Sequence, residues 1–322
     1  MPQLNDEGVW LEFDRLIADA NAQLSQLFEK IAQDLFTHED LIQAARRMSH
    51  LGFKRRYGAL DSKFVNGMAK LADEEQKRLW HRAMLLAAMI ETRRLPFFAG
   101  LPLLVRHYQL RSFRRILRNE TDLEQGWYSY EWDRYRKDLG LTTLALIASG
   151  NRVSDLTSGI HGRALLQGPL FQFPAKLGYI LRHGGFGPYI QTHIHDSQID
   201  RVEGLERQEN WRCCVLLFKS IPSLKGLMTI SWMEDPQLEW ISPRLYESGK
   251  IAFENGAKMF RLGQHPEATK NALAASRRRQ ELFKQGLYQP ENYMRLWSSA
   301  EMIKWSRSIE VSDDQPLLAI DH

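Results

Sequence analysis

The sequence predicts an α+β protein, with a helical N-terminal region (residues 1–120) followed by a mixed α/β domain (residues 121–322) that has a central, mostly antiparallel sheet. In the first region apolar residues recur at helical spacing, whereas in the second they gather in short runs bounded by turn residues. The chain has 322 residues, 43% hydrophobic and 25% charged, so each region can bury a core of its own.

Helices are expected to fill most of the first region. The spacing of apolar residues predicts helices over residues 10–35, 38–49, 73–94 and 103–118. Thr37 and Asp40 have the spacing of an N-terminal cap, which places the start of the second helix. Pro96, Gly100 and Pro102 separate the third helix from the fourth.

The second region is expected to alternate strands with helices. Short apolar runs predict strands over residues 139–147, 153–156, 189–194, 213–218, 227–233, 238–241, 258–262 and 293–297. Helices are expected over residues 170–182, 199–211 and 268–283. Pro266 suits the start of the last helix, and Gly286 suits its end.

The formal net charge of +4 is concentrated in the first region. Residues 92–119 contain seven arginines and no acid, namely Arg93, Arg94, Arg106, Arg111, Arg114, Arg115 and Arg118. Because the guanidinium group suits phosphate and carboxylate, the Arg93–Arg118 segment is predicted to face anions such as a nucleic acid or an anionic membrane surface. The alternative is a solvated helix face opposed by acids from elsewhere in the chain.

Several classes of protein are not favoured. No apolar run approaches the roughly 18 residues of a transmembrane helix, and residues 1–7 lack the plan of a signal peptide, so we expect a cytoplasmic protein without a transmembrane segment. The two cysteines, Cys213 and Cys214, are adjacent, which suits neither an ordinary disulfide nor a joint metal site.

A glycine-containing turn at Thr157–Leu166 follows a predicted strand and leads toward a helix. Backbone N–H groups in such a turn can approach a phosphate closely, and the dipole of the helix favours the anion. This stretch resembles the pyrophosphate loop of the N-acetyltransferases of the GNAT family. The alternative is that Gly159 and Gly162 only form a turn.

The last predicted helix extends the resemblance. Asn271, Ala274 and the stretch Leu282–Tyr288 are similar to the asparagine, alanine and Tyr-x-x-x-Gly-Phe pattern of the family's last helix, and residues 293–297 would be its closing strand.

The resemblance implies a donor site for acyl-CoA. Gly159, Gly162 and Arg163 would hold the pyrophosphate, Asn271 would belong to the same cofactor site, and Tyr288 would protonate the leaving thiolate. The resemblance also implies strands around residues 141–166 that splay into an acyl-CoA cleft.

A histidine pair ends the strand predicted at 189–194. His193 and His195 stand two apart, so on a strand they face the same side and, with Asp196, could bind a divalent metal. That arrangement would suit a metal-dependent hydrolase or oxygenase. The other interpretations are a single catalytic histidine, with His193 preferred, and two structural histidines.

Glu234 and Asp235 follow the strand predicted at 227–233. Carboxylates at a strand end are well placed to act as a base or to bind an amine, although a solvated turn is the simpler interpretation.

Together these features favour an acyltransferase with no tightly bound cofactor. It would move an acyl group from an acyl-CoA-like donor to an amine or hydroxyl of a small-molecule or peptide acceptor, with His193, Glu234, Asp235 and Tyr288 as catalytic candidates. The alternatives are the metal-dependent enzyme and a non-catalytic protein that binds anions, membranes or nucleic acid.

Overall fold

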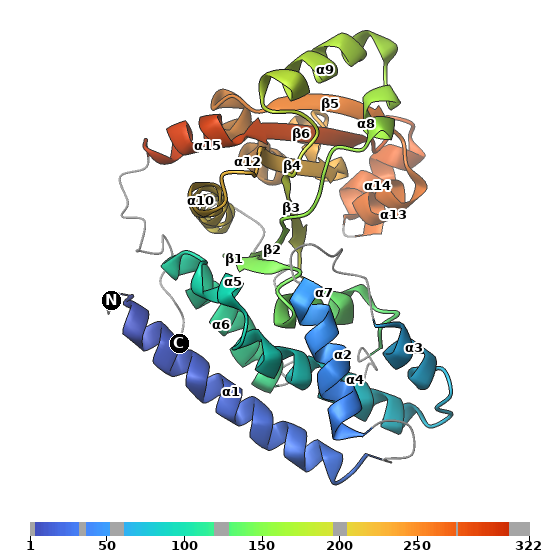
Figure 1. Cartoon of the computed structure of the whole chain (residues 1–322). Coiled ribbons are helices and arrows are strands. Elements are labelled where there is room, and N and C mark those ends of the chain that lie inside the picture. The colour runs from blue at the N-terminus through green and yellow to red at the C-terminus, as the bar shows by residue number, and fades with distance from the viewer. Residues whose placement is uncertain are drawn as a thin grey trace. The chain divides into compact units, whose positions relative to one another are not determined.

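The computed structural model describes residues 4–31, 37–51, 61–118, 129–195, 205–274 and 276–308 (Figure 1). The chain forms two compact units. Unit 1 comprises Met1–Thr157, His193–Val202 and Val311–His322, and unit 2 comprises Ser158–Thr192 and Glu203–Glu310. The boundary predicted between residues 120 and 121 lies outside the described residues.

Unit 1 is mainly helical. Its helices are α1 (Asp6–Phe28), α2 (His38–Leu51), α3 (Ser62–Met68), α4 (Glu74–Thr92), α5 (Pro96–Ala99), α6 (Leu103–Arg118) and α7 (Asp133–Thr142). The four helices predicted for this region are confirmed, as α1, α2, α4 and α6. The cap of α2 is also confirmed, because the Asp40 N–H donates to Thr37 Oγ1 at 3.1 Å and the Thr37 N–H donates to Asp40 Oδ2 at 3.2 Å.

Helix α4 is the centre of unit 1. It packs against α1, α2 and α7 and is buried along most of its length. Beside it, the Phe13 ring of α1 lies 4.3 Å from the ring of Phe98 and 6.0 Å from that of Phe113, between ring centroids. This aromatic cluster joins α1, α5 and α6.

A short antiparallel hairpin completes unit 1. β1 (Ile147–Ser149) pairs with β2 (Arg152–Asp155), and Gly150 provides the positive φ of 67° that the turn needs. The strand predicted over 139–147 is wrong for residues 139–142, which end α7. Their apolar side chains are buried on all sides of the helix, so the run carries no helical period.

Unit 2 contains most of the sheet. It begins with α8 (Gly162–Leu166), η3 (Leu170–Gln172), α9 (Phe173–Arg182) and β3 (Ile190–Ile194). The last residues of β3 belong to unit 1. Then come α10 (Leu205–Ser220), β4 (Gly226–Ser231), η5 (Trp232–Glu234), α11 (Leu238–Ile241), α12 (Pro243–Glu254) and β5 (Lys258–Gly263). The chain continues through α13 (Pro266–Ala274), α14 (Arg277–Lys284), β6 (Asn292–Ser298) and α15 (Ser299–Ser306).

The sheet is mixed. The strand order is β1-β2-β3-β4-β6-β5; β3 is parallel to β4, whereas β6 is antiparallel to both β4 and β5. The predicted α+β class is therefore confirmed, and the sheet is not purely antiparallel. Since β3 and β4 are parallel, the chain must cross over between them, and α10 makes this connection.

Two predicted strands are wrong. Residues 213–218 lie in α10 and residues 238–241 form α11. Cys213, Cys214 and the rest of the 213–218 run are buried on every side of α10, so its apolar residues resemble a buried strand rather than an amphipathic helix.

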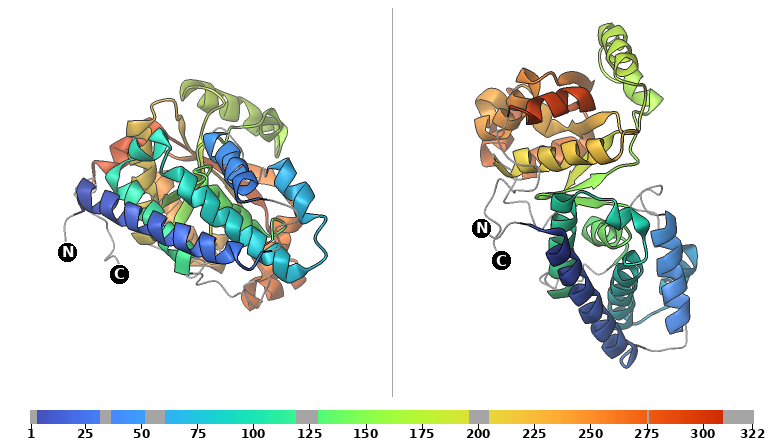
Figure 2. Two further views of the ribbon diagram at one scale, coloured as in Figure 1. Left: turned by 60° about the horizontal axis from the view of Figure 1, so that its bottom comes forward. Right: turned by 60° about the vertical axis from the view of Figure 1, so that its left-hand side comes forward.

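Both faces of the sheet in unit 2 are covered. On one face Trp297 of β6 meets Trp211 of α10 and Trp305 of α15, with ring centroids 5.2–5.5 Å apart. On the other face Met228 and Met294 pack with Ile180 of α9. The elements α9 and α10 thus lie on opposite sides of β4 and β6 (Figure 2).

Candidate functional site

The site of greatest interest in unit 2 is the edge of β4. The parallel register between β3 and β4 covers two residue pairs, Ile190 with Leu227 and Gln191 with Met228. β4 continues to Ser231, and among the described strands only β6 pairs with this last part. The other edge of residues 229–231 therefore has no strand partner among the described strands, with Thr229 buried and Ile230 38% exposed.

The two parallel strands of the sheet, β3 and β4, pair only over residues 190–191 and 227–228. The resemblance placed the splayed strands around residues 141–166, but β1 and β2 in that stretch form a closed hairpin of three residue pairs.

Glu234, at the carboxyl end of β4, is clamped by two arginines. Its Oε1 accepts a hydrogen bond from Arg207 at 3.0 Å and its Oε2 accepts one from Arg295 at 2.9 Å, and all three side chains are buried. The two guanidinium groups also lie 5.8 Å from the Trp211 ring. Because both carboxylate oxygens are occupied, the geometry favours a structural role for Glu234 over proton abstraction.

Asp235 has a different environment. Its carboxylate is buried and accepts hydrogen bonds from the backbone N–H groups of Gln237 at 2.9 Å and Glu291 at 3.4 Å. Burial raises the pKa of Asp235 to about 6, although the two backbone donors act in the opposite direction. A carboxyl group with this pKa can accept or release a proton near neutral pH.

Tyr288 lies in the same part of unit 2. It packs with Leu238 and Ile241, and its hydroxyl is buried with no hydrogen-bond partner among the described residues. Burial raises the pKa of the phenol, and the charge of Asp235 raises it further. The fold therefore brings two of the predicted catalytic residues, Asp235 and Tyr288, close enough for their charges to interact. A buried hydroxyl without a partner is uncommon.

We expect Tyr288→Phe to leave the free energy of unfolding unchanged or to raise it by up to about 1 kcal/mol, since it removes a polar group that folding desolvates without compensation. Tyr189→Phe is the matched control. Tyr189 is equally buried but donates a hydrogen bond to the Gly185 carbonyl at 3.2 Å, so its change should cost about 1 kcal/mol. Denaturant unfolding of both variants measures the difference. Equal losses would mean that the Tyr288 hydroxyl has a partner.

Asp235 is expected to make the stability of unit 2 depend on pH. Its folded pKa of about 6 lies above the ordinary 3.8, so the native state binds the proton more tightly than the unfolded state. Stability should therefore fall by about 2 kcal/mol as the pH rises from 4 to 7. Asp235→Asn should flatten this dependence, measured as the difference in unfolding free energy between the two pH values. An identical slope in the variant would contradict the raised pKa.

Sequence analysis did not single out Arg279. Its guanidinium lies 4.9 Å from the Trp232 ring centroid and donates to Ser242 Oγ at 3.0 Å and to the Ala272 carbonyl at 2.6 Å. Its charge also acts on Tyr288. Arg279 sits within a run of three arginines, 277–279, and only its burial distinguishes it from the other two.

In unit 1 the predicted histidines end β3. His195 is buried, and its Nε2 lies 3.0 Å from Asp138 Oδ1. Arg115 donates to both oxygens of the same carboxylate, to Oδ2 at 3.3 Å and to the Oδ1 that His195 also contacts. Burial alone would raise the pKa of Asp138, but Arg115 and His195 hold this pKa well below its usual range. Burial lowers the pKa of His195. For His193, burial lowers the pKa to about 4.

These surroundings do not favour a metal at the histidine pair. Arg115 Nη2 lies 3.5 Å from His195 Nε2, and the Lys137 ammonium donates to the Ile194 carbonyl at 2.7 Å. Cationic groups at this distance repel a divalent ion. Among the described residues no three His, Cys, Asp or Glu side chains form a metal-binding group. Asp196 lies outside the described residues, so the predicted site remains a prediction.

The predicted phosphate turn lies in unit 2. A Cβ on Gly159 would stand 3.2 Å from the Phe186 carbonyl oxygen, so the close approach of the chain accounts for this glycine. Gly162 begins α8, a helix of five residues, and has open space around the position of a Cβ. Arg163 and Asn271 are exposed, on α8 and α13 respectively. Their role in donor binding remains a prediction.

The arginine-rich segment contains α6 and the residues before it. Five of its seven arginines form ion pairs with acids outside the segment: Arg93 with Asp14, Arg94 with Glu91, Arg106 with Asp6, Arg114 with Glu12 and Arg115 with Asp138. The alternative of a basic face opposed by acids from elsewhere in the chain describes four of these, since Arg94 and Glu91 form an i,i+3 pair at the end of α4. Anion binding by the Arg93–Arg118 segment remains a prediction.

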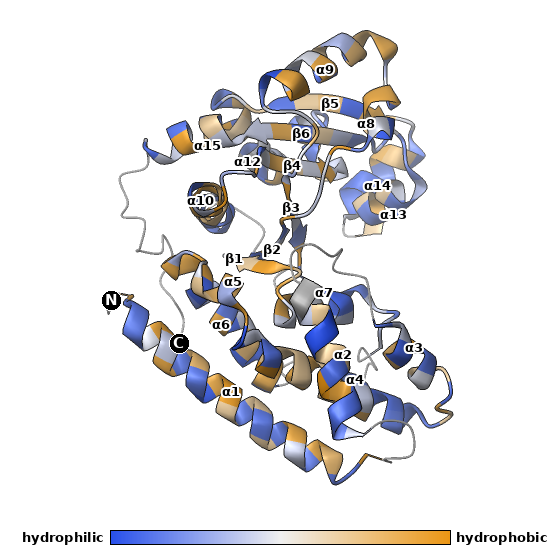
Figure 3. Ribbon diagram, viewed as in Figure 1, coloured by the Kyte–Doolittle hydropathy of each residue, from blue (hydrophilic) through white to orange (hydrophobic). Residues whose placement is uncertain are grey.

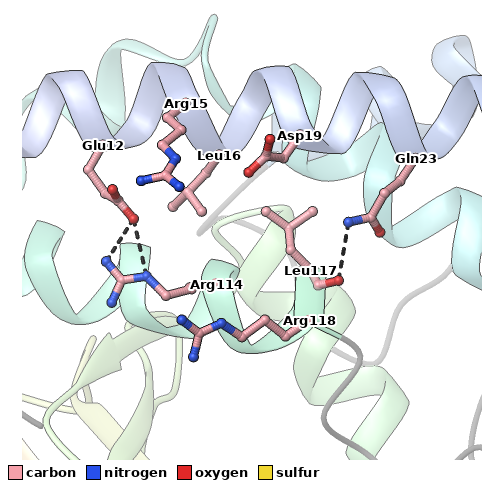
Figure 4. Close-up of a pocket in the computed structure, with 8 residues that line it drawn as sticks. All are labelled: Glu12, Arg15, Leu16, Asp19, Gln23, Arg114, Leu117 and Arg118. Carbon is pink, nitrogen blue, oxygen red and sulfur yellow. Dashed lines mark hydrogen bonds and ion pairs between the residues drawn. The ribbon is translucent and has the colours of Figure 1, made fainter. Parts of the chain in front are cut away.

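A pocket of about 390 Å³ lies between α1 and α6 (Figure 4). Its lining residues are Glu12, Arg15, Leu16, Asp19, Gln23, Arg114, Leu117 and Arg118. Within it Arg114 donates to Glu12 at 2.7 Å and Gln23 donates to the Leu117 carbonyl at 3.3 Å. Because charges of both signs line the pocket, it favours no single class of charged ligand.

Comparison with known proteins found no family model, no curated protein and no solved structure that matches the chain. Any functional conclusion therefore depends on the geometry of its own residues.

Proposed function

We propose that the chain is an acyltransferase and that unit 2 binds an acyl-CoA-like donor along the edge of β4. The observation that carries the proposal is that β3 pairs with β4 over only two residue pairs, so that one edge of residues 229–231 has no paired strand among the described residues. The pantetheine arm of CoA is extended and contains two amides, so it can pair with a strand edge as another strand would.

Unit 2 also offers groups for the proton transfers. In the proposed step the nitrogen or oxygen of the acceptor attacks the thioester carbonyl carbon, a new bond forms there and the C–S bond breaks. Asp235 takes the proton from the acceptor, and Tyr288 gives a proton to the thiolate. Both side chains are buried, so the proposal requires opening of the segment from Trp232 to Ile241.

The resemblance adds a position for the pyrophosphate of the donor, at Gly159, Gly162 and Arg163. The open space around Gly162 makes this part of the proposal easy to test, because Gly162→Val should not disturb the fold. Loss of CoA binding in a folded Gly162→Val variant would support this position, and unchanged binding would exclude it.

The test of the proposed function is ligand-induced stabilisation. CoA or acetyl-CoA at a hundredfold excess over its Kd should stabilise the protein by about 2.7 kcal/mol, seen as a rise in melting temperature. Ile230→Glu adds an anion beside the β4 edge and should weaken binding about tenfold. Leu287→Glu is the matched control, since Leu287 is another exposed apolar side chain in unit 2. No stabilisation by CoA thioesters up to millimolar concentrations would contradict the proposal.

A further inference from the structure

The segment of residues 162–186, which contains α8, η3 and α9, has an unusual outer surface. Five large apolar side chains protrude from it, with exposed fractions of 66% for Leu166, 77% for Leu170, 80% for Phe171, 60% for Leu181 and 41% for Phe186. In Figure 3, α8 and α9 contain orange, apolar turns, which in α9 alternate with blue and pale ones. Most large apolar side chains in the described residues are buried, so this concentration requires an explanation.

The segment is firmly attached to unit 2 by its inner side. Ala164 and Ile180 belong to the core that includes Met228 and Met294. The Lys176 side chain is buried and donates to the carbonyls of Ala164, at 3.3 Å, and Gln167. These contacts fix the orientation of α8 and α9, so the apolar side chains project outward from a supported surface.

The exposed charged side chains of the segment itself are all cationic. Residues 156–195 contain no aspartate or glutamate, whereas Arg163 and Arg182 are exposed on α8 and α9. The Lys225 side chain adds a third cation beside Gly184. One acid from another element contacts the segment, because Glu301 of α15 accepts a hydrogen bond from the Tyr179 hydroxyl of α9 at 3.2 Å, but its side chain is only partly exposed. An apolar surface with exposed cations in the same segment is complementary to anionic phospholipid, whose headgroups attract the cations while its acyl chains receive the apolar side chains.

We propose that the outer side of residues 162–186 docks on the surface of an anionic phospholipid bilayer. The side chains protrude singly with more than half of their surface exposed, except for Phe186. Protruding side chains suit insertion between lipid headgroups, whereas a protein partner would need a matching, closely packed surface. In the described part of the chain, no helix is both long enough and apolar enough to cross a bilayer. The docking is therefore interfacial.

Sedimentation of the full-length protein with lipid vesicles tests the proposal. The protein should bind vesicles of 70% phosphatidylcholine and 30% phosphatidylglycerol, and Leu170→Asp with Phe171→Asp should lower the partition coefficient at least about tenfold. These side chains make few contacts, so the variant should keep the melting temperature of the parent. Leu11→Asp is the matched control, because Leu11 is 74% exposed in α1, and it should bind like the parent.

A second pair of variants tests the charges. Arg163→Glu with Arg182→Glu should weaken binding more than about fivefold, whereas Arg244→Glu with Arg307→Glu, at exposed positions elsewhere in unit 2, should not. Absence of vesicle binding, or equal binding by the parent and the Leu170/Phe171 variant, would overturn the proposal. Concentration-dependent dimers that the same variant abolishes, without vesicle binding, would instead assign this surface to a second copy of the chain and also overturn it.

Discussion

Glu234→Gln is expected to destabilise unit 2 by about 3–5 kcal/mol. The carboxylate is buried between Arg207 and Arg295, with hydrogen bonds of 3.0 and 2.9 Å. The substitution keeps the shape of the side chain but leaves two buried guanidinium groups without their counter-ion. Hydrogen exchange of the backbone amides of β4 and β6 measures the loss within unit 2.

Glu254→Gln is the matched control in the same unit. Glu254 is exposed and lies 3.9 Å from Lys250, so its change should alter stability by no more than about 0.5 kcal/mol. If Glu234→Gln cost as little as the control, solvent would have to reach the two arginines. Their burial in the structure would then be wrong.

Asp138→Asn is expected to destabilise unit 1 by a similar amount, about 3–5 kcal/mol. Asp138 is fully buried in α7, between the Arg115 guanidinium and the His195 ring. Asparagine carries no charge, so the mostly buried guanidinium of Arg115 would lose its counter-ion, which destabilises the folded state. Urea unfolding, followed by hydrogen exchange of the amides of α6 and α7, measures the effect in unit 1.

The pH dependence gives a second test of Asp138. Its folded pKa lies below the ordinary 3.8, so its ionised form stabilises unit 1 above pH 4, and this contribution is lost as the pH falls toward the folded value. Asp14→Asn is the control, since Asp14 forms an exposed ion pair with Arg93. If both variants lost stability equally, the carboxylate of Asp138 would not be buried as described.

The sequence predicts the amphipathic helices correctly, whereas it does not predict helical segments that are buried on every side. Helix α6 has the bounds 103–118 that its spacing predicts, because its apolar residues recur at helical spacing and pack against α1, α7 and β1, while the positions between them are polar. The helix predicted over 199–211 overlaps the first part of α10, but residues 213–218 were predicted as a strand, because they are buried on every side of the helix and show no helical period. The parallel pairing of β3 with β4 is a property of strand order, and no local pattern in the sequence encodes strand order.

The candidate site at Asp235 and Tyr288 was only partly predictable, because its residues come together from distant parts of the sequence. The position of Asp235 at a strand end and the resemblance at Tyr288 point to these residues, but their common environment depends on residues 53 positions apart. The arginines that neutralise Glu234 are 27 and 61 positions away, so sequence analysis treats Glu234 as a free carboxylate. Asp138 lies within α7 directly after Arg136 and Lys137, so the sequence gives no local sign that its carboxylate is buried.

Hydrogen exchange at the edge of β4 tests the proposed donor site most directly. Saturating CoA should slow the exchange of backbone amides within Thr229–Ser231 at least about tenfold, because the pantetheine arm would pair with that edge. The amides of unit 1 serve as the internal reference. Protection confined to Gly159–Arg163, or unchanged exchange throughout unit 2 in the presence of CoA, would contradict donor binding along β4.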